Sequence, residues 1–98
     1  MKLRRRHLLA AGSATLLAGA HLGAALVALR AGQHAMALDR ARANWAIQHE
    51  VEDAQLLIDA AVAAGKPEEA RPVLDWIADE GLAIPALRIP EAVAAAAR

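Results

Sequence analysis

The pattern of hydrophobic and polar positions separates an uncharged N-terminal stretch from a body with helical periodicity. No residue between Arg6 and Arg30 carries a fixed charge. The apolar part of this stretch, Leu8 to Leu29, would be about 33 Å long as a helix, which is enough to cross the hydrocarbon core of a bilayer. We therefore predict a signal anchor or transmembrane helix within residues 1–30.

The same stretch also fits a cleavable export signal. Basic residues precede an apolar run from Leu8 to Leu17, and Ala18-Gly19-Ala20 has the small-x-small pattern of a cleavage site. The run Arg5-Arg6-His7-Leu8-Leu9 resembles a twin-arginine signal, which implies export. Retention of the stretch and cleavage near Ala20 are both open alternatives.

Charge predicts the orientation of the chain. Lys2 and three arginines precede the apolar stretch, whereas the cations that follow it are fewer and are offset by Asp39. Positive charge favours the cytoplasmic side of a membrane segment. We predict a single-pass protein of a bacterial inner membrane, with a cytoplasmic N-terminus and a periplasmic body. After cleavage the same body would be a soluble periplasmic or secreted protein.

Small residues recur every four positions in the N-terminal stretch, at Ala11, Thr15, Gly19 and Gly23. This spacing places them on one face of a helix. Small side chains allow a second helix to approach closely within a membrane. We predict that Thr15, Gly19 and Gly23 pack against another membrane helix.

The body begins with a long segment that lacks helix breakers. Neither Pro nor Gly occurs from Ala35 until Gly65, so we predict one long helix of up to thirty residues that ends at a glycine cap. One set of its apolar positions shares a face, which we expect to be the seam of the core. This face comprises Ala43, Ile47, Val51, Ala54, Ile58, Ala61 and Val62, and the adjoining polar stripe comprises Gln48, Glu52, Gln55 and Asp59.

A second helix is predicted after the turn at Gly65. Pro72 would remove a backbone hydrogen bond inside a helix, so this helix either starts near Ala70 or bends at Pro72. Gly81 provides a C-terminal cap. Residues 31–82 are thus predicted to form a helical hairpin.

Part of this hairpin, over about residues 54–77, resembles a tetratricopeptide repeat. The positions that match the spacing of that family's helix-turn-helix are Leu57, Gly65, Glu68-Glu69-Ala70 and Leu74. Positions where the family has a small residue, a bulky residue and a closing proline are occupied by Ile58, Ala61 and Leu82. The resemblance implies a helical hairpin that binds protein.

Residues 83–98 are predicted to form a proline-punctuated arm and a short helix. Pro85 and Pro90 each force the preceding isoleucine into an extended conformation, and Pro90-Glu91 opens the helix. Alanine fills 28 of the 98 positions and Phe and Tyr are absent, so propensity favours helix throughout. The predicted fold class is all-α.

Charge and side-chain chemistry exclude several functions. Residues 31–98 carry six basic and eleven acidic side chains, so a cationic head precedes an acidic body, which indicates targeting and not nucleic-acid binding. Beyond Thr15 there is no Ser, Thr, Tyr or Cys to act as a nucleophile. We predict that the protein is not an enzyme and uses no cofactor.

Two groups of residues are candidates for binding. His49, Glu52 and Asp53 are spaced to lie on neighbouring turns of one helix face, where they could ligate a metal ion or form a solvated polar face. Apolar residues opposite the seam, together with a second tryptophan, are predicted to contact a partner. These residues are Leu38, Trp45, Leu56 and Trp76.

The leading functional hypothesis is a non-enzymatic, membrane-anchored accessory or adaptor subunit. Its partner would be a larger membrane or exported protein complex, or a second copy of the chain, and nucleic acid is not expected. The alternative is a signal-cleaved, exported helical module that binds a metal ion or a peptide.

Overall fold

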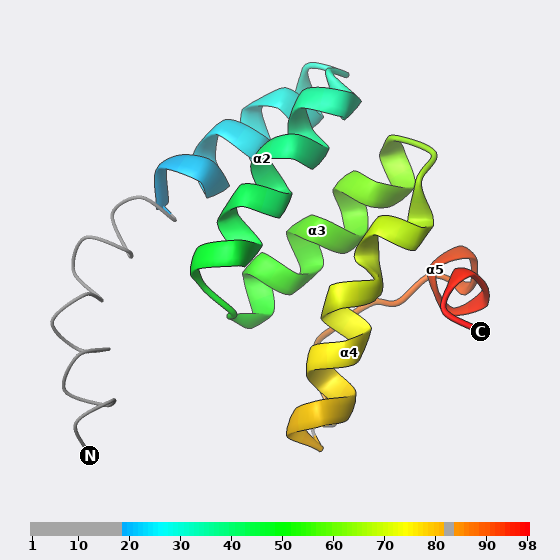
Figure 1. Ribbon diagram of the computed structural model, residues 1–98. Coiled ribbons are helices and arrows are strands. Elements are labelled where there is room, and N and C mark those ends of the chain that lie inside the picture. The colour runs from blue at the N-terminus through cyan, green and yellow to red at the C-terminus, as the bar shows by residue number, and fades with distance from the viewer. Residues whose placement is uncertain (1–18, 82–83) are drawn as a thin grey trace, which may run out of the picture.

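The computed structural model describes residues 19–81 and 84–98, and every regular element within these ranges is a helix (Figure 1). The predicted all-α fold class is confirmed. A helical segment over residues 19–30 is followed in order by α2 (His34–Ile47), α3 (Val51–Ala63), the 3-10 turn η1 (Pro67–Ala70), α4 (Arg71–Glu80) and α5 (Glu91–Ala96).

Segment 19–30 lies beside α2, with a sharp reversal at Gly32 (Figure 1). Gly32 has φ +76°, the left-handed conformation that glycine adopts readily, and Gln33 N donates to the carbonyl of Ala28 at 2.8 Å. Ala25 and Ala28 are completely or almost completely buried, at 0% and 1% exposure. The second half of the uncharged stretch therefore packs within the helical body.

The predicted membrane helix is not supported by the described residues. Within residues 19–81 and 84–98, no helix has the combined length and apolarity needed to cross a bilayer. Much of the predicted span, including Ala11 and Thr15 of the small-residue stripe, lies outside these ranges. Gly19 and Gly23 fall within them, and the space beside each glycine is open.

The prediction of one long helix is wrong, because residues 48–50 separate α2 from α3. The break has a polar cause. Asp53 Oδ2 accepts the backbone N–H of Glu50 at 2.9 Å, and Asp53 Oδ1 accepts the side-chain N–H of Asn44 at 2.7 Å. The carboxylate caps the start of α3 and ties it to α2, so the chain reverses without Gly or Pro.

Because α2 folds back onto α3, residues on both sides of the predicted long helix enter the core. Leu38, Trp45 and Leu56, which were predicted to contact a partner, are 4%, 7% and 4% exposed and are covered by their own chain. The predicted seam is divided in the same way. Its members Ala54, Ile58 and Ala61 are buried, Ala43 and Ile47 are half-buried, and Val51 and Val62 are exposed.

The turn that follows α3 lies at Gly65. Lys66 N donates to the carbonyl of Ala61 at 2.8 Å, and Gly65 has φ +70°, which ends α3 at the expected glycine. The following helix, α4, begins at Arg71 with Pro72 in its first turn, where no backbone hydrogen bond is lost. The predicted start near Ala70 is confirmed.

The described C-terminal part consists of a non-helical arm and a short helix. Residues 84–90 are non-helical, and α5 follows directly after Pro90. This helix contacts η1 and α3, and its Val93 side chain is 1% exposed. The tail is therefore packed on the body.

Replacing Asp53 by alanine is expected to destabilise the protein by about 2–3 kcal/mol. The change leaves Asn44 without its partner in the core and removes the cap of α3. The free energy of unfolding is measured by urea titration with circular dichroism. Glu52→Ala, at the exposed neighbouring position, is the control and should cost about 0.5 kcal/mol or less. Equal losses in the two variants would contradict this account.

Candidate functional site

Three aromatic rings from three parts of the chain meet where α2 ends. The rings of Trp45 and His49 are stacked, with centroids 4.0 Å apart. Trp76 of α4 approaches Trp45 edge-on at 5.3 Å and His49 at 6.0 Å. These are favourable geometries for aromatic pairs. The cluster thus joins the turn between α2 and α3 to α4.

Access differs among the four residues predicted to bind a partner. Trp76 is half-buried, so part of its ring is accessible, whereas Leu38, Trp45 and Leu56 belong to the buried core. The partner-binding role of Trp76 stays a prediction. The three buried residues are covered by their own chain, so they present no surface to a partner.

The predicted metal ligands His49, Glu52 and Asp53 do not form a metal site. In the described part of the chain, no group of three or more His, Asp or Glu side chains is arranged to hold a metal ion. His49 precedes α3 and stacks on Trp45, so the assumption of a shared helix face was wrong. The Asp53 carboxylate already accepts hydrogen bonds from Asn44, Gln48 and the Glu50 backbone.

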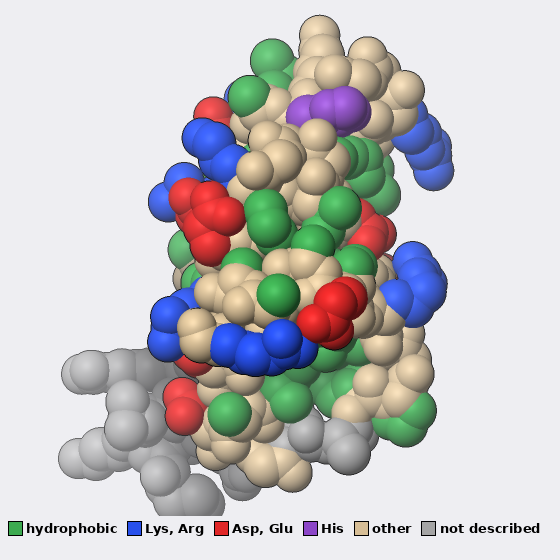
Figure 2. All heavy atoms as spheres, turned by 90° about the vertical axis from the view of Figure 1, so that its right-hand side faces the viewer, with side chains coloured by type: hydrophobic (Ala, Val, Ile, Leu, Met, Phe, Trp, Pro, Cys, Tyr) green, Lys and Arg blue, Asp and Glu red, His purple; other side chains and the backbone are tan. Residues whose placement is uncertain are grey.

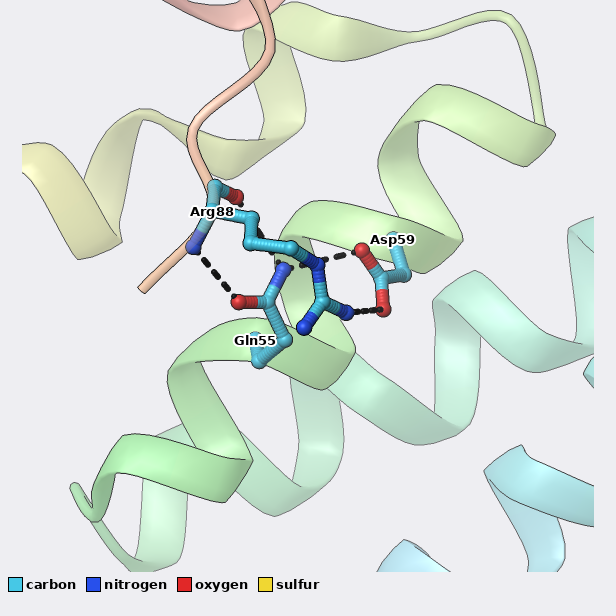
Figure 3. A network of polar contacts seen from close by, with 3 residues as sticks. All are labelled: Gln55, Asp59 and Arg88. Atoms are coloured by element: carbon cyan, nitrogen blue, oxygen red, sulfur yellow. Dashed lines mark hydrogen bonds and ion pairs between the residues drawn. The ribbon is translucent and has the colours of Figure 1, made fainter. Parts of the chain in front are cut away.

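A polar clamp on α3 holds the C-terminal arm (Figure 3). Gln55 Oε1 accepts the backbone N–H of Arg88 at 2.8 Å, and Gln55 Nε2 donates to the Arg88 carbonyl at 3.1 Å. Asp59 Oδ2 lies 3.9 Å from Arg88 Nη2. Gln55 and Asp59 share a polar stripe in the sequence, but their contact with the arm follows from tertiary structure, which sets the path of the arm.

On segment 19–30, every exposed position before Arg30 carries a small or apolar residue. The buried side of the segment contacts the core, while the opposite side, its outer face, has no charged group before Arg30. Val27 is the most exposed of its large hydrophobic side chains, at 67%. The exposed positions before Arg30 are Gly19, Ala20, Gly23, Ala24, Leu26 and Val27.

Other surfaces are mixed in charge. A hollow of about 200 Å³ between the start of α2 and the end of α3 carries both acidic and basic side chains, and Arg42 and Glu69 face each other there at 3.8 Å. On the face with α5, acidic and basic side chains are interspersed with apolar ones (Figure 2). Neither surface is matched to a ligand of one charge.

Comparison with known proteins gives no relatives: no family model matches the chain, and neither the curated proteins nor the solved structures include a match.

Replacing Trp45 by alanine is expected to lower the free energy of unfolding by about 3–5 kcal/mol, because the buried ring leaves a cavity and two aromatic contacts are lost. Thermal unfolding of the purified variant measures the loss. His49→Ala is the matched control, since it removes only the exposed ring of the cluster, and it should cost about 1 kcal/mol. If Trp45→Ala left stability unchanged, its ring would not be part of the core.

Proposed function

We propose that the protein is a non-enzymatic accessory or adaptor subunit, held at a membrane by its N-terminal stretch, whose helical body docks on a larger protein assembly. The observation that carries this proposal is the exposed face of segment 19–30, on which every exposed position before Arg30 is small or apolar. An exposed apolar surface that adjoins further apolar sequence favours contact with lipid or protein. In the sequence this segment directly follows the apolar run Leu8 to Leu17 and the basic residues before it.

The packing of segment 19–30 bears on the mode of attachment. Leu22 packs on the core, and Ala25 and Ala28 are buried in it, so these residues are engaged by the body. The remaining uncharged interval, residues 8–21, would measure only about 21 Å as a helix, whereas the hydrocarbon core is about 30 Å thick. Attachment along the membrane surface needs no unpacking of the body. Basic residues near the N-terminus would add attraction to anionic lipid headgroups.

Two features of the body support the adaptor role: the partly accessible Trp76 and the lack of nucleophilic side chains. Trp76 is only half-buried on α4, which α2 and α3 separate from segment 19–30 (Figure 1). A membrane contact at segment 19–30 would therefore leave α4 free for protein contacts. The lack of hydroxyl and thiol nucleophiles beyond Thr15 argues against covalent catalysis by this chain.

Val27→Glu is expected to reduce the membrane-bound share of the protein by roughly tenfold, because it places a charge on the outer face and removes apolar contact area. Cells that produce each variant are separated into membrane and soluble fractions, and the intact mass of the chain is determined in each. The wild-type chain should appear in the membrane fraction at its full-length mass.

Val62→Glu is the matched control, because it introduces the same charge at an exposed valine of α3. It should leave the distribution unchanged. If both substitutions had the same effect, the outer face of segment 19–30 would not be the surface that holds the protein at the membrane.

A second candidate is an exported module from which the N-terminal stretch has been removed. It is favoured by one observation: the described core contacts of segment 19–30 begin at Leu22, just after the predicted cleavage site at Ala20. Cleavage there would leave Ala25 and Ala28 in place. The intact-mass measurement separates the two proposals, since a soluble chain that begins near His21 supports the second and overturns the first.

A further inference from the structure

The clamp on α3 satisfies both backbone groups of one residue. Gln55 accepts the N–H of Arg88 and donates to its carbonyl through a single side-chain amide. These groups are present in every extended peptide, so the contact recognises extended main chain and not one particular side chain. The arm thus binds α3 as a separate peptide would.

The Gln55 amide is also oriented without the arm. Gln55 Nε2 donates to Asp59 Oδ1 at 3.0 Å, one turn further along α3 (Figure 3). An amide nitrogen has two hydrogens, so one is held by Asp59 while the other faces the arm. This second contact keeps the recognising group pre-organised, which lowers the entropic cost of binding a new peptide.

The neighbouring contacts indicate which peptide fits. Leu87 is half-buried against the core, and the next residue, Arg88, faces the Asp59 carboxylate at 3.9 Å. The acidic body, with eleven acidic and six basic side chains over residues 31–98, also favours a basic ligand. The matching pattern is an apolar residue followed directly by arginine or lysine.

The arm itself is held lightly. The Arg88 and Asp59 side chains are 77% and 41% exposed, and the two hydrogen bonds to Gln55 are exposed to solvent. Exposed ion pairs contribute little stability, and exposed segments with few buried contacts open easily. Tethering compensates for these weak contacts, because a covalently linked arm has an effective concentration in the millimolar range at its site. A free peptide therefore competes only when it binds well or when the arm is weakened.

We propose that the Gln55–Asp59 face of α3 is a binding site for an extended peptide of a partner protein, in which an apolar residue precedes arginine or lysine. Residues 84–90 occupy the site until that peptide displaces them. This inference gives a recognition mode to the proposed adaptor role and rests on that role for the identity of the peptide as part of a partner. It does not require membrane attachment.

The test uses a synthetic peptide with the sequence of residues 84–90, titrated into the full-length protein. Leu87→Asp weakens the arm in the chain while leaving Gln55 intact, and Arg88→Asp does so independently through repulsion by Asp59. The readout is the nuclear magnetic resonance signal of the Gln55 side-chain amide. Both variants should bind the peptide at least tenfold more tightly than the wild-type chain, because their own arm occupies the site less often.

Two controls establish the site. Adding Gln55→Leu to the Leu87→Asp chain should abolish peptide binding, which is monitored in this variant through the backbone amide signals of α3. Adding Gln33→Leu, at an exposed position outside α3, should leave binding unchanged. A peptide with aspartate in place of its arginine should bind at least threefold more weakly. Peptide binding that survives Gln55→Leu, or no binding by either arm variant, would overturn the proposal.

An exchange of arms between two copies would also overturn it. Native mass spectrometry of the peptide-free Leu87→Asp chain should show a monomer, and a dimer would assign the site to self-association instead. The peptide titration uses purified protein without membranes. Its failure would therefore leave the membrane fractionation result standing, and failure of membrane attachment would leave the peptide site standing.

Discussion

The carboxylate of Asp53 is the constraint on which the rest of the structure depends. It is 1% exposed and joins Asn44 on one helix to the first turn of the next. A buried charged acceptor stabilises a chain reversal only where several donors surround it, and here Asn44, Gln48 and the Glu50 backbone provide them. Asn44 Oδ1 has no hydrogen-bond partner within the described residues. The hydrogen bond between Asn44 and Asp53 is therefore accompanied by a buried oxygen without a donor, which costs free energy of folding.

This chain reversal affects the surfaces of segment 19–30, α3 and α4. Trp45 becomes part of the core and meets Trp76, and segment 19–30 covers α2 with one side while its other side stays exposed. The polar stripe of α3 is left facing the arm through Gln55 and Asp59. The surfaces proposed for a membrane, for a folded partner and for a peptide thus lie on separate parts of one small bundle.

The sequence predicted the parts of the fold that depend on local backbone chemistry. Gly65 and Gly81 take left-handed conformations at helix ends, and Pro72 occupies a first helical turn, as their residue types require. The break at residues 48–50 was missed because it depends on a contact between Asn44 and Asp53 that no local rule includes. The sequence does contain the two residues responsible, since Asn44 and Asp53 are polar positions in an alanine-rich stretch. In the structure both are buried in the core.

The burial of residues that were predicted to bind a partner has a related reason. A helical wheel identifies apolar sides but not the neighbours that cover them, so Leu38 and Leu56 were assigned to a partner when their own chain buries them. Hydropathy is ambiguous in the same way, since burial in lipid and burial in a protein core remove the same apolar area from water. Residues 19–29 therefore form part of the apolar stretch predicted to be a membrane helix, while they pack on the helical body.

The reversal at Asp53 can be measured directly by pulsed electron paramagnetic resonance. The natural chain has no cysteine, so spin labels at Met36→Cys and Val62→Cys, both exposed positions, would be unique. The ends of α2 and α3 that carry them line the same hollow, and packed helices have axes about 8–10 Å apart, so we expect a label separation below about 25 Å. A continuous helix over the same residues would place the labels roughly 39 Å apart, and that distance would contradict the account.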